Sequence, residues 1–221
     1  EIQRDALADI TLELLAAARG MAAASGGDVV VLVLSAEGDR FAPRLGAADR
    51  IVLVDHPQLA SYSPEPYVEA LQEVVAAEQP RAVLVGGTSI GWDLAPMLSA
   101  RIGAPLLTGC KAVQADGKSL LATCSFCGGK MLADVVVAQS PAVFMLLPGS
   151  CRPTGESGKA RVEVRVPAAP LEPGAVCFEE LILPDASDVD ITQQDILIAV
   201  GRGIQQKDNV ELAEELAAAL G

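Results

Sequence analysis

Hydrophobic residues in the first hundred positions follow two patterns, short unbroken runs and longer segments with helical spacing. The unbroken runs are rich in valine and leucine and cover Asp28–Ser35, Arg50–Asp55 and Arg81–Gly86. A short continuous apolar run is typical of a strand that is buried on both faces, as the strands of parallel sheets are. We therefore predict three strands of a parallel sheet in this half of the chain.

The segments between these runs have the features of helices. Thr11–Ala24 is rich in alanine and leucine, and a serine and two glycines follow it as a C-terminal cap. Ser63 and Pro64 suit the N-cap and first position of a second helix. Further helices are expected at Phe41–Ala48 and Trp92–Ile102. Strands that alternate with helices indicate right-handed βαβ units and a three-layer α/β fold with a mainly parallel sheet.

Beyond about residue 105 the pattern changes to short apolar runs that are separated by glycine-containing turns. Runs and turns at this spacing are typical of neighbouring strands in an antiparallel sheet. We predict an antiparallel extension of the parallel sheet. Its expected strands are Lys111–Ala115, Ser119–Cys124, Met131–Ala138, Ala142–Leu147 and Arg161–Val166.

A last region begins near Asp188. Asp195–Val200 is another continuous apolar run, and Asp208 with Glu211 has the form of a capping box at the start of a helix. We predict that this region is the first β-α unit of a second domain. The expected domains are therefore residues 1–187 and 188–221.

Charge and composition exclude several classes of function. The formal net charge is −13 at pH 7, which argues against binding to nucleic acids and to anionic membranes. No apolar run approaches the ~20 residues of a membrane span. The five cysteines are odd in number and scattered, so we expect free thiols in a reducing compartment.

Two glycine-containing turns are candidate anion sites. The turn Gly86–Gly91 lies between a predicted strand and helix, where it could hold a phosphate or could simply be a tight connection. In the turn Gly201, Arg202 and Gly203, the guanidinium could bind a pyrophosphate that the glycines allow to approach. The alternative is a solvated arginine. Gln206 stands where the third glycine of a dinucleotide-binding fingerprint would be, so the ordinary Rossmann motif is not complete.

Other chemistry has little support in the sequence. Cys124 and Cys127 have C-x-x-C spacing, but no second pair of ligands accompanies them, and chance explains the spacing best. The only histidine, His56, follows a predicted strand and is expected in a surface loop without a role as a base. We therefore predict neither catalytic residues nor a metal site.

Several stretches, taken together and in order, resemble the alpha subunit of electron transfer flavoproteins. The Gly-Arg-Gly turn behind an apolar run is the most specific of these features. The matching segments are Thr11–Ala22, Leu45–Asp55, Tyr62–Val75, Leu84–Cys110, Phe126–Val135, Pro141–Pro153 and Asp195–Ile204.

The resemblance implies an N-terminal α/β domain with an adenine-nucleotide-hydrolase-like fold, followed by an FAD-binding domain. Arg202 is at the position of the family arginine that touches FAD, and Gly201 and Gly203 flank it. Family members begin with a short buried strand and continue well beyond the position of Gly221. The resemblance thus implies that the second domain is truncated here and that most of the FAD site lies outside these residues.

The function implied is electron carriage by a heterodimer rather than catalysis by an enzyme. The expected partner is a beta subunit that holds AMP or a second flavin. Electrons would come from acyl-CoA or other flavin dehydrogenases and pass to a quinone reductase or another acceptor. A bacterial cytoplasm is expected, with the mitochondrial matrix as the alternative. Two other functions stay open, a small adenine-nucleotide-binding module that uses Gly86–Gly91 and a cofactor-free docking domain.

Overall fold

The computed structural model of the chain describes residues 1–3, 5–153, 158–182, 191 and 194–221. Contacts within the chain divide it into two compact units, Glu1–Phe178 and Glu179–Gly221. The boundary predicted between residues 187 and 188 lies outside the described residues, and the domain limits stay a prediction.

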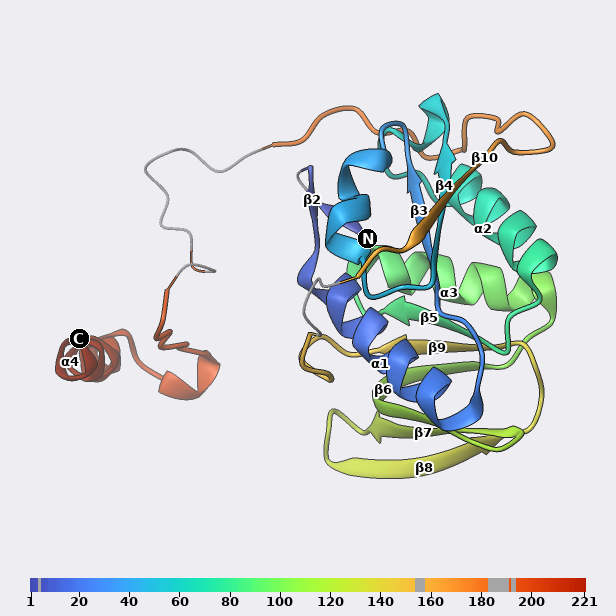
Figure 1. The fold of residues 1–221 in the computed structure, drawn as a ribbon. Coiled ribbons are helices and arrows are strands. Elements are labelled where there is room, and N and C mark those ends of the chain that lie inside the picture. Colours follow the sequence, from blue (N-terminus) through green and yellow to red (C-terminus); the bar gives the residue numbers. More distant parts are fainter. Residues whose placement is uncertain (4, 154–157, 183–190, 192–193) are drawn as a thin grey trace. The chain divides into compact units, whose positions relative to one another are not determined.

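The first unit contains two larger sheets and a short hairpin (Figure 1). One sheet has the order β10-β4-β3 and is parallel throughout. The other has the order β5-β9-β6-β7-β8, in which β5, β9 and β6 are parallel and β6, β7 and β8 are antiparallel. The strands are β1 (Ile2–Gln3), β2 (Ala6–Leu7), β3 (Val30–Ser35), β4 (Arg50–Asp55), β5 (Ala82–Gly86), β6 (Leu106–Asp116), β7 (Ser119–Phe126), β8 (Met131–Val137), β9 (Ala142–Leu146) and β10 (Arg161–Arg165).

Helices cover both faces of the parallel strands. They are α1 (Asp9–Ser25), α2 (Pro64–Glu78) and α3 (Ser89–Ile102), together with the 3₁₀ segments η1 (Asp39–Leu45) and η2 (Pro57–Leu59). On β4, Ile51 and Leu53 pack with α1, whereas Val52 and Val54 pack with α2. Successive residues of a strand point to opposite faces, so α1 and α2 lie on opposite sides of the sheet. The predicted three-layer α/β fold is confirmed.

The predicted antiparallel extension is correct for β6, β7 and β8 but wrong for β9 and β10. All five residues of β9 are buried, and β9 inserts between β5 and β6, parallel to both. Phe144 packs with α1 and Met145 with α3, so this strand needs cover on both faces. β10 pairs in parallel with β4 at the edge of the other sheet. Neither position follows from the neighbouring sequence, because both pairings join segments that are far apart in the chain.

Two helix N-termini differ from the prediction, α3 in the residue at which it begins and α2 in the bond that its N-cap side chain makes. α3 begins at Ser89, three residues earlier than expected, and the Thr88 hydroxyl caps it by accepting the Gly91 N–H at 3.2 Å. Ser63 is the N-cap of α2 as predicted, but its hydroxyl makes no capping bond. It donates instead to the Val176 carbonyl at 2.7 Å, which fastens the segment after β10 to the start of α2.

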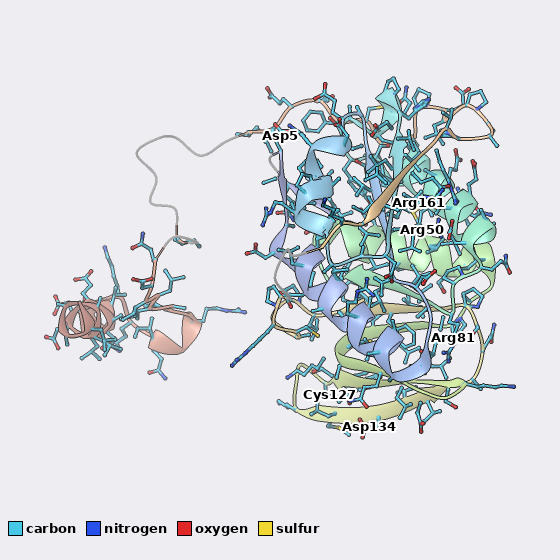
Figure 2. The ribbon with its side chains drawn as sticks, viewed as in Figure 1. Asp5, Arg50, Arg81, Cys127, Asp134 and Arg161 are labelled. Atoms are coloured by element: carbon cyan, nitrogen blue, oxygen red, sulfur yellow. The ribbon has the colours of Figure 1, made fainter. Side chains whose placement is uncertain are left out.

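Two ion-paired carboxylates hold the edge strand β10 against β4 and α2. Glu78, the last residue of α2, pairs with both Arg50 and Arg165. Glu163 lies 3.0 Å from Arg50 and 2.7 Å from Arg165, and Figure 2 shows Arg50 on β4. Partial burial disfavours the Glu78 carboxylate, but hydrogen bonds from the two arginines outweigh it and hold the pKa of Glu78 below its ordinary value.

A buried carboxylate also ties α1 to the loop after β9. Glu13 is 8% exposed, and its two oxygens accept the N–H groups of Gly149 at 3.1 Å and Cys151 at 3.3 Å. Gly149 has a φ of +80°, a conformation that glycine adopts without strain. The two N–H groups therefore converge on one side chain, and the loop is fixed to the helix that covers the sheet.

The second unit contains the 3₁₀ turns η4 (Arg202–Ile204) and η5 (Lys207–Asn209) and the helix α4 (Val210–Leu220). The strand predicted at Asp195–Val200 is wrong: this segment is irregular, and Ile196 and Leu197 are 55% and 59% exposed. Within the described residues of this unit there is no strand to pair with it, and an unpaired strand does not form a sheet. No described helix is long and apolar enough to cross a membrane.

The predicted capping box at the start of α4 is also wrong. Asp208 lies within η5, and the N-cap of α4 is Asn209, whose side chain makes no capping bond. The Asn209 amide donates to the Ile204 carbonyl at 2.9 Å instead. The 3₁₀ turn moves the N-cap from Asp208 to Asn209, so the helix starts one residue later than expected.

Replacing Glu78 by glutamine is expected to lower the free energy of unfolding by about 1–3 kcal/mol at pH 7, because two partly buried arginines lose a shared carboxylate. Since the folded-state pKa is lowered, this stability is present above the unfolded pKa of about 4.3 and is lost as the pH falls through the folded value. Urea unfolding at pH 7 and below pH 4 measures both effects. Glu69→Gln on the same helix is the control, since Glu69 is exposed and lies 3.9 Å from Arg101; equal losses for the two variants would contradict the role of Glu78.

Glu13→Ala is expected to destabilise the first unit by about 1–3 kcal/mol, because the N–H groups of Gly149 and Cys151 lose their acceptors inside the protein. Glu13→Gln keeps one carbonyl acceptor and should lose about half as much. Hydrogen exchange of those two amides gives the local readout. Unchanged amide protection in Glu13→Ala would show that the carboxylate does not hold the loop.

Candidate functional site

The turn at Gly201, Arg202 and Gly203 is the candidate cofactor site, and it lies in the second unit. Gly201 is extended, with φ −109° and ψ −176°, and the turn closes through a 3.1 Å bond from the Ile204 N–H to the Gly201 carbonyl. All three residues are exposed. Among the described residues, no carboxylate pairs with the Arg202 guanidinium. The turn therefore presents a positive charge to solvent.

The two glycines leave open space on either side of that charge. A Cβ atom built on Gly201 or Gly203 would meet no heavy atom within 4 Å. Packing within this unit therefore does not demand glycine here, and neither glycine has a positive φ. An anion could approach the backbone at both positions without meeting a side chain. These residues fit one phosphate or pyrophosphate group, held by the guanidinium and the local backbone.

The other candidate anion site, Gly86–Gly91, is explained by packing. A Cβ on Gly86 would lie 2.7 Å from the Ile10 side chain, and one on Gly91 would lie 1.7 Å from the Gly86 carbonyl oxygen. The Gly87 N–H donates to Leu146 at 2.6 Å, and the Gly91 N–H donates to Thr88. These two N–H groups already donate hydrogen bonds within the protein. Gly86 and Gly91 are needed because a side chain at either position would collide with neighbouring atoms. The tight-connection interpretation therefore accounts for this loop.

The two cysteines of the C-x-x-C spacing lie in different environments, and the histidine has a local capping role. Cys124 is buried in β7, whereas Cys127 is exposed in the turn after it. Figure 2 labels Cys127. The His56 Nδ1 accepts the Gln58 N–H at 3.2 Å and so caps η2 in a loop. In the described part of the chain, no three histidine, cysteine or acidic side chains gather at a spacing that could hold a metal ion.

Sequence patterns missed three arrangements that the structure brings together. These are the Glu78 ion pairs, the Glu13 loop anchor and the contact of Cys110 with Cys124. Each joins residues on different elements, and in most of these contacts the residues are far apart in the chain. The one available signal is the alternation of buried positions in β7, which places Cys124 on the buried face. In β6 a register shift between Cys110 and Ala112 interrupts the alternation, so the sequence pattern does not place Cys110.

Comparison with known proteins gives the family. The model of the electron transfer flavoprotein domain matches residues 1–171. The chain is 29% identical to the electron transfer flavoprotein subunit alpha of Clostridium acetobutylicum, over 99% of this chain and 68% of that protein. It is 27% identical to Protein FixB of Azotobacter vinelandii, over 100% of this chain and 64% of that protein.

The match extends across the whole chain. The electron transfer flavoprotein subunit alpha of Bacillus subtilis is 25% identical over 100% of this chain and 68% of that protein. The chain thus spans about two thirds of the length of these curated relatives. Since the domain model covers most of the chain and the relatives match the rest, the chain belongs to the electron transfer flavoprotein family.

Proposed function

We propose that the chain acts as the alpha subunit of a heterodimeric electron transfer flavoprotein and carries electrons through a bound FAD. The observation that carries the proposal is the family match over residues 1–171, continued by relatives named subunit alpha through the turn at Arg202. A protein of this kind relays electrons, so its own residues bind and orient the cofactor rather than cleave a substrate.

Arg202 is the residue that we assign to the cofactor. A bound FAD would supply the redox chemistry. The guanidinium of Arg202 would donate paired, charge-assisted hydrogen bonds to a pyrophosphate oxygen pair, and Gly201 and Gly203 would admit that group to the backbone. The open space at both glycines and the exposed guanidinium support this assignment. One turn supplies only part of the binding energy for a ligand as large as FAD.

The proposed partners follow from the same assignment. We propose a beta subunit with AMP or a second flavin, electron donors among acyl-CoA or other flavin dehydrogenases, and a quinone reductase as acceptor. One relative, 25% identical over 97% of this chain, is the acryloyl-CoA reductase electron transfer subunit beta of Anaerotignum propionicum. The bacterial relatives favour a bacterial cytoplasm as the location.

Arg202→Ala is expected to weaken flavin binding by about 10- to 100-fold in the co-purified heterodimer, since a charged hydrogen-bond donor to the pyrophosphate is lost. Arg202→Lys keeps the positive charge but lacks the planar guanidinium, so its affinity for flavin should lie between those of the parent and of Arg202→Ala. Flavin absorbance per heterodimer and a fluorescence titration with FAD measure the change.

Lys207→Ala is the matched control, because Lys207 is an exposed cation in the neighbouring turn of the same unit. It should leave flavin retention unchanged. An Arg202→Ala heterodimer that binds FAD as tightly as the parent would remove Arg202 from the site. A parent heterodimer that binds AMP but no flavin would overturn the proposed function itself.

A further inference from the structure

Two cysteines face each other inside the second sheet of the first unit. Cys110 of β6 and Cys124 of β7 are direct partners across the antiparallel pair. Their sulfur atoms lie 3.7 Å apart, and the residues are 0% and 1% exposed. The pair belongs to the core cluster with Phe144, Leu146 and Met21. Neither residue is part of the proposed flavin site.

The geometry of this pair suits a disulfide. Directly opposed residues of an antiparallel pair have Cα atoms about 4.5–5.5 Å apart, within the 4.4–6.8 Å range that disulfides use. The two sulfur atoms are already in contact, so rotation of the side chains can join them without a change of strand register. Beside the pair, Gly109 has a φ of +66° and approaches the Ser125 carbonyl closely. A register shift between Cys110 and Ala112 gives the strand further local freedom.

We propose that Cys110 and Cys124 are an oxidation site, at which hydrogen peroxide converts the two thiols to a cross-strand disulfide. The thiolate of one cysteine attacks an oxygen atom of the peroxide. An S–O bond forms, the O–O bond breaks and hydroxide departs, so that this cysteine becomes a sulfenic acid. The thiolate of the other attacks that sulfur, the S–S bond forms, and a second hydroxide leaves. With the two thiol protons, the products are one disulfide and two waters, and the peroxide is the species reduced.

Cys124 is the sulfur that we expect peroxide to reach first. Its strand, β7, is separated from solvent on one side only by the edge strand β8, whereas β6 lies between β7 and β9. Several apolar side chains of β8 are exposed, including Met131, Leu132 and Val136. An edge strand with few buried contacts opens more readily than a central one. Opening of β8 from β7 therefore gives the small oxidant its route.

Burial keeps the pair reduced until that opening occurs. Desolvation, together with the neighbouring Cys124 sulfur, raises the pKa of the Cys110 thiol to about 12. A neutral, buried thiol is a poor nucleophile. The reaction is therefore slow in the closed protein, and its rate depends on both the opening of the edge and the pH.

The test uses the full chain with Cys127→Ser, Cys151→Ser and Cys177→Ser, which removes the exposed or partly exposed thiols. The folded protein is treated with hydrogen peroxide, quenched with catalase, denatured and alkylated. We expect a mass lower by two hydrogens and no alkylation. Trypsin should then release residues 102–111 linked to residues 119–130, and dithiothreitol should separate them. The rate should rise about 10-fold or more between pH 7 and pH 9, as the thiolate fraction grows.

Two further measurements show whether the bond joins Cys110 to Cys124. Cys110→Ser and Cys124→Ser, each in the same background, should form no intramolecular bond and should alkylate or over-oxidise instead. In the parent chain with all five cysteines, the same cross-link should form. Full alkylation of both thiols after peroxide treatment, sulfinic acids on both, or a Cys124–Cys127 bond in the parent would each overturn the proposal.

Discussion

Burial of both faces of the parallel strands is the constraint on which the first unit depends. On β4, Ile51 faces α1 and Val52 faces α2, and on β9 the same division separates Phe144 from Met145. Since β4 and β9 each contribute apolar side chains to two layers, helices must cover both sides, and the connections must cross from one strand to the next over the sheet. The order of elements follows from this requirement.

In this unit, charged side chains hold the segments that lie at the margins of the apolar layers. Glu78 gathers two arginines at the edge where β10 joins β4, and Glu13 fixes the loop that follows β9. A carboxylate that is partly buried is stable only with donors around it, so these contacts specify one arrangement of edge and loop. The apolar core alone would tolerate several such arrangements, because hydrophobic contact has little directional preference.

Sequence patterns predicted those elements whose limits are set by their own and neighbouring residues. The limits of β4 were predicted to the residue, because a run that is buried on both faces ends where polar residues begin. The start of α3 was missed, since Gly91 looks like part of a turn, yet it is helical and is needed beside the Gly86 carbonyl. The direction of β9 depends on β5 and β6, and no pattern within the run Ala142–Leu146 contains that information. The contact of Cys110 with Cys124 likewise requires the register of two strands.

In the candidate site, too, the sequence predicts what depends on neighbouring residues and fails where the structure depends on distant ones. Sequence spacing could select Arg202, because a charge between two glycines is a local feature, but the strand expected before it did not form. That run exposes Ile196 and Leu197, and α4 exposes Leu212 and Leu216, so the second unit has apolar surface that its own elements leave uncovered. A guanidinium in open solvent gains less from a phosphate than one in a water-excluded site, where the local dielectric is low. The contribution that we propose for Arg202 in flavin binding thus depends on what covers those side chains, so its effect has to be measured in the assembled heterodimer.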